Sequence, residues 1–244
     1  MRFLIFAIAA FATGVFSAPA PQADPIRILP SNWEWDIADL KGPGCPDLNY
    51  ESGWKTRYNY GQNTMDGSEI YFTVFAYPYL NASIPAGQTS ASVWCETTLK
   101  YTEFSKPTNG VRGPPASDYR LRPHKNGTLI GALYDLDEGV TAEWKFTYHA
   151  PAEKKVVDSI SFTGPLKNKY QSDNMLNTPF ETRNQWEAPE CGATTVKFRI
   201  DLAVTADKAG KKGTATSEPR TDANGNPANY GTWVGVSFDF EKCT

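Results

Sequence analysis

Apolar and polar residues alternate through much of the chain, most clearly over residues 140–148. Every second residue there is apolar: Val140, Ala142, Trp144, Phe146 and Tyr148 alternate with Thr141, Glu143, Lys145 and Thr147. In an extended strand, successive side chains point to opposite faces, so a period of two residues puts all five apolar residues on one face. An α-helix would scatter them around its circumference. The segment therefore predicts a β-strand with one face in a core.

The same pattern predicts further strands along the chain. Residues 194–204 repeat it strongly, and residues 70–77 are apolar on both faces, as in a central strand that is covered on both sides. Other predicted strands lie at 54–60, 93–101 (with Cys95 on the core side), 129–136, 156–163 and 234–240. No window shows a sustained 3.6-residue period with capping signals, so we predict an all-β fold, an antiparallel β-sandwich or jelly roll.

Three segments depart from this pattern. Residues 1–17 have a basic start, an apolar run and a small residue at the end, as is typical of a cleaved secretory signal peptide. Residues 18–41 form an N-terminal segment, Pro-rich up to residue 30, which we interpret as an extended linker or a propeptide. Residues 205–230 are almost free of large apolar side chains, and we interpret them as a flexible loop within one sandwich domain spanning 42–244.

Composition narrows the class of partner. The chain has 244 residues, of which 40% are hydrophobic and 13% aromatic, enough for a sizeable core in one all-β domain. Its formal net charge is only -3, so no summed field draws it to nucleic acid or anionic lipid. No stretch after the leader approaches the length of an apolar membrane span. We therefore expect a secreted, extracellular protein without a nucleic-acid or membrane partner.

Four cysteines are an even number in a chain predicted to enter an oxidising compartment, so we expect two disulfides and no metal or redox motif. They are Cys45, Cys95, Cys191 and Cys243. Three pairings are open, with a slight preference for Cys45 with Cys95 and Cys191 with Cys243. Two Asn-x-Ser/Thr triplets, at Asn81 and Asn126, predict glycosylation in exposed loops if the host is eukaryotic.

The sequence predicts no complete catalytic set. His124 and His149 are the two histidines, neither accompanies a Gly-x-Ser-x-Gly elbow, and we interpret both as surface residues. Glu143, with Glu96 or Glu69, would be the carboxylate pair of a glycoside hydrolase only if the two faced each other across a cleft. Glutamates on the polar face of a strand are more often exposed to solvent.

Two further groups of residues suggest ligands. The acidic stretch 135–139 could hold Ca²⁺, but it lacks the spacing of an EF-hand loop and is better explained as a turn between strands. Trp33 and Trp35 point the same way if the chain is extended. They are candidate surface aromatics for stacking on sugar rings, but we favour a packing role that docks the N-terminal segment. We therefore expect no metal and no cofactor.

Several short motifs occur in an order seen in one family: Gly44-Cys45-Pro46, Trp94-Cys95, Gly139-Val140-Thr141, Phe162-Thr163-Gly164-Pro165 followed by Tyr170, and Cys191-Gly192. Over residues 42–204 the chain thus resembles the secreted, mainly fungal proteins grouped as domain of unknown function 4360. It departs from them at Leu121, which stands where the family's Asp-Tyr-Arg-Gly element has glycine. The resemblance implies secretion and brings no catalytic residues.

These observations predict a secreted, non-enzymatic β-sandwich that binds a glycan or a protein at a cell wall or host surface. The alternative is a carboxylate-based β-sandwich glycoside hydrolase that uses Glu143. A structural protein without a small ligand is a third possibility, and the three differ in whether the fold builds a cleft with paired carboxylates or an exposed binding surface.

Overall fold

The computed structural model describes residues 32–45, 57–64, 69–149, 155–175, 190–217 and 232–243. This part of the chain folds into β-strands without a helix. The strands are β1 (Asn32–Lys41), β2 (Arg57–Thr64), β3 (Glu69–Tyr77), β4 (Ala82–Ser83), β5 (Ser90–Phe104), β6 (Tyr119–Leu136), β7 (Val140–His149), β8 (Lys155–Thr163), β9 (Leu166–Met175), β10 (Ala193–Ala206), β11 (Gly213–Thr216) and β12 (Thr232–Lys242). A search of these residues finds no helix able to cross a membrane.

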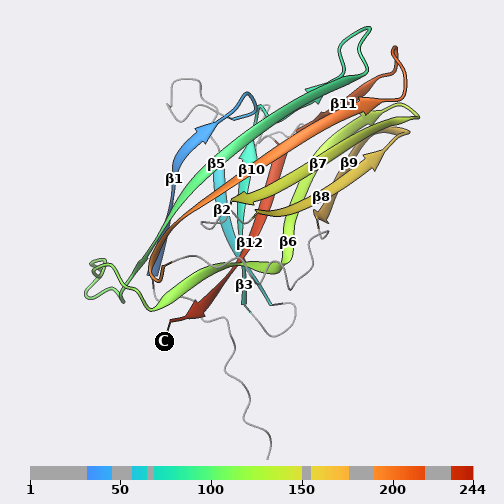
Figure 1. The fold of residues 1–244 in the computed structure, drawn as a ribbon. Helices are drawn as coiled ribbons and strands as arrows, with labels where there is room; N and C mark the ends of the chain where they lie inside the picture. The colour runs from blue at the N-terminus through green and yellow to red at the C-terminus, as the bar shows by residue number, and fades with distance from the viewer. Residues whose placement is uncertain are drawn as a thin grey trace, which may run out of the picture.

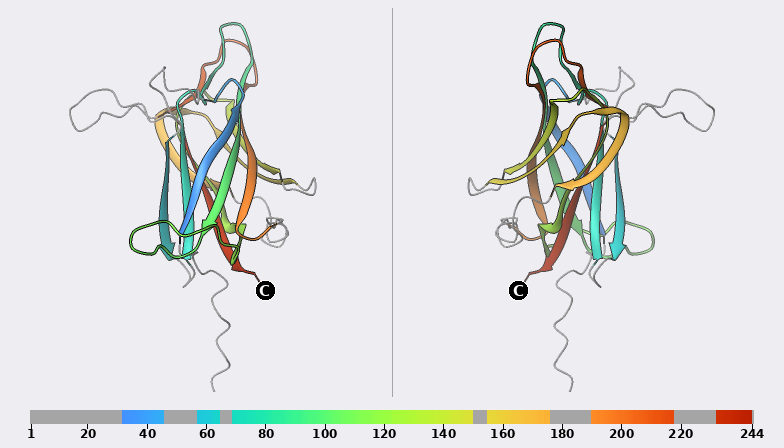
Figure 2. Two further views of the ribbon diagram at one scale, coloured as in Figure 1. Left: turned by 90° about the vertical axis from the view of Figure 1, so that its left-hand side faces the viewer. Right: turned by 90° about the vertical axis from the view of Figure 1, so that its right-hand side faces the viewer.

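The strands form two antiparallel sheets that pack face to face (Figures 1 and 2). One sheet has five strands in the order β1-β5-β10-β7-β8. The other runs β2-β3-β12-β6-β11-β4, with β9 paired to β6. This arrangement confirms the prediction of an all-β antiparallel sandwich.

The core lies between the sheets and is built from the alternating residues of the longest strands. All five apolar residues that define the period of β7 are buried, as are Val196, Phe198, Ile200, Leu202 and Val204 on β10. Phe198 stacks on Phe146 within its own sheet, with 5.0 Å between ring centroids, and meets Phe75 of the opposite sheet at 5.4 Å. Trp144 Nε1 donates a hydrogen bond of 2.7 Å to the Tyr134 hydroxyl across the core.

The described residues correct two segment assignments. Residues 32–41 belong to the sandwich, because β1 pairs with β5 along its length. The sandwich domain therefore begins at or before residue 32 rather than at the predicted residue 42. The predicted loop at 205–230 is also wrong in part: β10 continues to Ala206, and Gly213–Thr216 forms β11 between β6 and β4. Residues 218–231 of that segment lie outside the described residues, as does the predicted signal peptide.

Small side chains explain why β11 escaped prediction. A Cβ at Gly213 would meet Val140, Ile84 and Val204, so only glycine lets this strand approach the core. Ala215, the next residue on the same face, is fully buried. Alternation detects strands that bury bulky apolar side chains, whereas β11 is buried because its backbone approaches the core closely.

Two disulfides hold the ends of strands together, and both join the cysteines that the sequence slightly favoured: Cys45–Cys95 and Cys191–Cys243. The first ties the turn after β1 to β5 within the five-stranded sheet. The second joins the start of β10 to the end of β12 and thereby links the two sheets. Oxidised cysteines fit an extracellular location.

Candidate functional site

The outer face of the five-stranded sheet carries a shallow depression of about 470 Å³, which we call the Glu143 depression. Its walls come from the outward positions of β7 and β10 together with Val157 of β8: Glu143, Lys145, Thr147, His149, Val157, Arg199, Asp201 and Ala203. The alternation that buries Trp144 and Ile200 turns these residues toward solvent. The residues are brought side by side because β7 pairs with β10, with Glu143 opposite Ala203 and Lys145 opposite Asp201.

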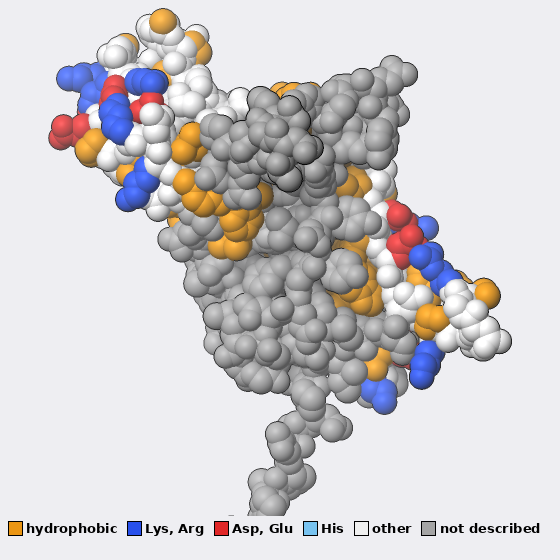
Figure 3. Space-filling model, turned by 180° about the vertical axis from the view of Figure 1, so that it is seen from behind, with side chains coloured by type: hydrophobic (Ala, Val, Ile, Leu, Met, Phe, Trp, Pro, Cys, Tyr) orange, Lys and Arg blue, Asp and Glu red, His pale blue; other side chains and the backbone are white. Residues whose placement is uncertain are grey.

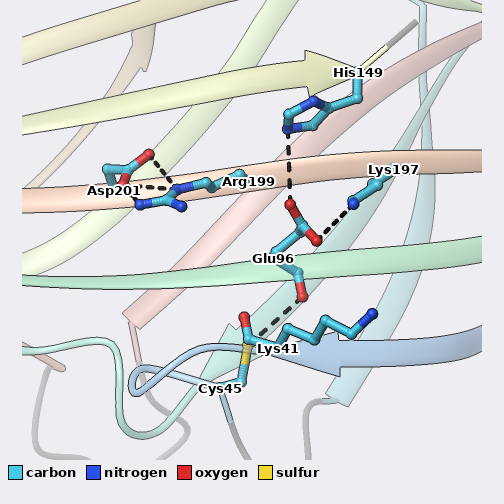
Figure 4. A network of polar contacts seen from close by, with 7 residues as sticks. All are labelled: Lys41, Cys45, Glu96, His149, Lys197, Arg199 and Asp201. Carbon is cyan, nitrogen blue, oxygen red and sulfur yellow. Dashed lines mark hydrogen bonds and ion pairs between the residues drawn. The ribbon is translucent and has the colours of Figure 1, made fainter. Parts of the chain in front are cut away.

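Arg199 is held rigidly at the edge of this depression (Figure 4). Its Nε lies 2.9 Å and 3.0 Å from the two carboxylate oxygens of Asp201, and its guanidinium carbon lies 4.1 Å from the centre of the Trp94 ring. The hydrogen bonds that Arg199 donates to Asp201 raise the pKa of Arg199 above its ordinary value. A charge fixed by both a bidentate partner and an aromatic face loses little freedom when it binds a ligand.

A second cluster of charges lies further along the same face. Lys197 Nζ lies 2.7 Å from Glu96 Oε1, and His149 Nε2 lies 3.9 Å from Glu96 Oε2. Figure 4 shows the Glu96 carboxylate between these two side chains, one from β10 and one from β7. The Glu96 side chain is only 16% exposed, so its charge is offset by close partners rather than by solvent.

His149 also lines a second depression of about 480 Å³, the Glu190 depression. Its other walls are Lys100, Tyr101, Glu190, Ala193, Thr194 and Thr195. The two depressions therefore meet at one side chain. Both lie over β10, the central strand of the sheet.

The Cys45–Cys95 disulfide braces the rim of this face. Cys95 is fully buried on β5 between Trp94 and Glu96, whereas Cys45 lies in the turn beyond β1. The turn lies so close to Trp94 that a Cβ at Gly42 would collide with the Trp94 ring. Gly42 has a φ of 126°, which also favours glycine. The aromatic partner of Arg199 is thus fixed by the turn and the bridge.

The carboxylates named for a hydrolase are not brought together as a facing pair. Glu96 is opposite Arg199, which is opposite Thr147, four residues from Glu143 on β7. With about 3.3 Å per residue and roughly 4.8 Å per strand, the Cα atoms of Glu96 and Glu143 lie about 16 Å apart. Glycosidase carboxyl groups are separated by roughly 5–10 Å. The Glu69 side chain lies outside the described residues.

The two tryptophans named as surface aromatics pack toward the core instead. Trp35 is only 4% exposed and lies 5.1 Å from the Tyr101 ring, and half-buried Trp33 lies 6.5 Å from the Phe240 ring. The suggestion of an exposed stacking pair is therefore wrong. The outward positions of β1 are polar, and its aromatics dock the edge strand onto the sandwich.

The acidic turn between β6 and β7 is neutralised by lysines. Lys167 Nζ lies 2.6 Å from Asp137 Oδ1 and 3.4 Å from Asp135 Oδ1, and Lys212 also contacts both aspartates. Hydrogen bonds from the lysines hold the pKa of Asp135 and of Asp137 below the ordinary range. Figure 3 shows acidic and basic side chains close together at this end of the molecule. Both aspartates are thus paired with lysine side chains at the turn between β6 and β7.

The remaining predicted residues fall outside the two depressions. Asn81 is exposed in the turn between β3 and β4, where its side-chain amide donates to the Pro78 carbonyl at 3.3 Å. Asn126 and His124 lie within β6, at an irregularity in its pairing with β12, rather than in a loop. Their side chains lie outside the described residues.

Sequence analysis did not assign Lys145, Arg199 or Asp201 to a site. The signal was present in part, because all three occupy outward positions of strongly alternating strands. What could not be read was that β7 and β10 are neighbours. Residues separated by some fifty positions share one depression only because of that pairing.

Comparisons with known proteins give weak structural similarities. No family model matches the chain, and no curated protein matches it. Among solved structures, TmCBM61 in complex with β-1,4-galactotriose aligns at 11% identity and a TM-score of 0.21, covering 82% of this chain and 95% of that one. CBM28, a carbohydrate-binding module specific for non-crystalline cellulose, aligns at 13% identity and a TM-score of 0.21, covering 85% and 86%. At such TM-scores the ligands of those proteins carry no argument for this chain.

Proposed function

We propose that this protein is an extracellular carbohydrate-binding protein that holds a neutral glycan on the outer face of its five-stranded sheet. The observation that carries the proposal is the charge balance of the Glu143 depression. Two acidic side chains, Glu143 and Asp201, are matched there by two basic ones, Lys145 and Arg199.

A charge-balanced polar surface selects against charged polymers. For a polyanion or a polycation, the attraction to two of these charges is offset by repulsion from the other two, whereas neutral hydroxyl groups can hydrogen-bond to both kinds of charge. Carboxylates accept hydrogen bonds, and ammonium and guanidinium groups donate them, so a sugar hydroxyl can use both kinds of partner at once. Val157, which is 40% exposed, and Ala203 supply apolar contacts for the C–H faces of a sugar ring.

The site is also rigid enough to bind a ligand at low entropic cost. The side chains project from paired strands, and the Cys45–Cys95 bridge braces the adjacent edge. Arg199 is fixed by Asp201 and Trp94 before any ligand arrives. Preorganised groups spend less of their interaction energy on ordering when they bind.

Binding to immobilised neutral polysaccharides tests the proposal. The oxidised mature chain is passed over cellulose, β-1,3-glucan, mannan, galactan and xylan, with heparin as the polyanion. We expect retention on at least one neutral polysaccharide and none on heparin at physiological salt. Loss of a hydrogen bond to a charged group in Glu143→Gln or Lys145→Met should weaken binding about tenfold.

Lys242→Met on β12 is the matched control, because it removes an exposed lysine from the other sheet. It should bind as the unmodified protein does. Absence of retention on every neutral polysaccharide, or unchanged binding by both depression variants, would contradict the proposal. A cell wall or host surface is the proposed location of the glycan, and secretion follows from the predicted signal peptide.

A further inference from the structure

The Glu143 depression on the outer face of the five-stranded sheet and the Glu190 depression at one end of that sheet adjoin, and we call the two together the trough. They meet at the side chain of His149, which lines both. His149 is opposite Lys197, which lies on β10 between Ala203 at one end of the trough and Thr195, two residues away, at the other. These two end residues are eight positions apart, so the trough follows β10 for about 26 Å.

Acidic and basic groups recur together along this length. Glu143 and Asp201 accompany Lys145 and Arg199 at one end, and Glu96 accompanies Lys197 between the two ends. At the far end Glu190 accompanies Lys100. Thr147 lines the Glu143 depression and Thr195 lines the Glu190 depression, so each also has a hydroxyl-bearing side chain in its wall. Each part of the trough therefore offers both donors and acceptors without a net charge, as a repeating neutral ligand requires.

A short saccharide would contact only part of this surface. A pocket for a single terminal sugar would enclose it and concentrate the polar groups at one place, whereas this trough is shallow and open over both depressions. The same kinds of side chain are instead spread along β10 and its neighbours β7 and β5 over about 26 Å. A linear chain matches such a surface better than a branched or terminal unit does.

Resting on the proposed carbohydrate-binding function, we infer that the protein binds an internal stretch of a linear neutral polysaccharide. The chain lies along β10, with successive sugar units in the Glu143 depression, over His149 and in the Glu190 depression. Affinity then depends on the length of the glycan, because a longer chain reaches more of the donors and acceptors.

Isothermal titration of the full oxidised protein with cello-, laminari- and manno-oligosaccharides, from disaccharide to hexasaccharide, tests this inference. For the series that binds, the hexasaccharide should bind at least about tenfold more tightly than the disaccharide, the gain from one or two further hydrogen bonds. The stoichiometry should remain one glycan per protein.

Substitutions at the two ends separate a trough from a single depression. Glu143→Gln replaces a charged acceptor at one end by a neutral amide, and Thr195→Val removes a hydroxyl at the other end. Thr195→Val keeps a β-branched side chain on an exposed strand position. Both should weaken binding of the hexasaccharide, and the disaccharide should be weakened by no more than one of them. Lys242→Met again serves as the control.

The outcomes distinguish the inference from the function on which it rests. Equal affinity for the disaccharide and hexasaccharide, or a hexasaccharide insensitive to Thr195→Val, would overturn the trough and leave glycan binding intact. Absence of binding to any saccharide of the three series, together with no retention on the immobilised polysaccharides, would overturn both.

Discussion

The hydrogen bond between Trp144 and Tyr134 provides a direct test of how the two sheets are joined. Trp144 lies on β7 and Tyr134 on β6, and both side chains are fully buried. Burial raises the pKa of the Tyr134 hydroxyl well above its ordinary value, so the group stays neutral and accepts the indole N–H at 2.7 Å. Tyr134→Phe removes this acceptor and almost nothing else.

The expected cost follows from the dryness of the site. Without the oxygen, the indole N–H is left without this partner where solvent does not reach, and an unsatisfied buried donor costs about 1–3 kcal/mol. The outer face of the other sheet offers a matched control, because Trp233 Nε1 donates to the Tyr170 hydroxyl there. Those two side chains are half-buried, so water can replace the lost partner and Tyr170→Phe should cost at most about 1 kcal/mol.

Equilibrium unfolding in urea, followed by far-ultraviolet circular dichroism with the disulfides intact, measures both costs. Tyr134→Phe should lower the midpoint more than Tyr170→Phe does, with the same dependence of the free energy of unfolding on denaturant. Equal midpoints for the two variants would refute the reasoning. So would a smaller loss for Tyr134→Phe, because burial would then not determine the cost of the missing acceptor.

Three further predictions concern other parts of the fold. Gly131→Ala should lower the free energy of unfolding in urea by about 1–3 kcal/mol, because the added Cβ would collide with the Trp233 ring. Gly235→Ala is the control and should cost less, because its Cβ would lie 3.4 Å from Leu129. A larger loss at Gly235 than at Gly131 would contradict this reasoning. The lowered pKa of Asp135 means that its ion pairs stabilise the fold above about pH 4, and this stabilisation is lost as the pH falls through the folded-state pKa. Asp135→Asn should therefore lose less stability than the unmodified protein between about pH 5 and pH 2. Glu138→Gln, a change at the exposed neighbour, is the control and should behave as the unmodified protein. Replacing Cys45 and Cys95 together by alanine opens a bridge with a sequence separation of 50 and should cost about 4 kcal/mol of stability, and peptide mapping without reduction should recover this pair and Cys191–Cys243 in the unmodified chain.

Alternation of apolar and polar residues is sufficient to predict the strands that contribute most of the core. It works where a strand buries large apolar residues on one face, as β7 and β10 do, because the pleat fixes the direction of every second side chain. It failed for β1, where Trp35 is the one buried side chain and five of the ten residues are polar, and for β11, where glycine and alanine take the buried positions. The proposed signal peptide and the resemblance to domain of unknown function 4360 stay predictions.

The candidate site could be predicted only in fragments. The types and positions of His149, Glu143 and Glu96 mark them as candidate functional residues, but nothing in the pattern of a single strand places Arg199 and Asp201 beside them. A depression on a sheet face is assembled from neighbouring strands, and neighbours in this fold are distant in sequence. The same pairing that brings Glu143 near Asp201 places the Cα atom of Glu96 about 16 Å from that of Glu143, so these two glutamates are not neighbours on the sheet.

The sequence by itself determined the β character of the chain, the buried faces of its main strands and the number of its disulfides, because these depend on local alternation and on a count of thiols. Tertiary structure alone decided which strands are neighbours, which cysteines are joined and which charges balance one another in the trough. Those properties arise from contacts between segments far apart in the chain, and the period of a single strand carries no information about its partner.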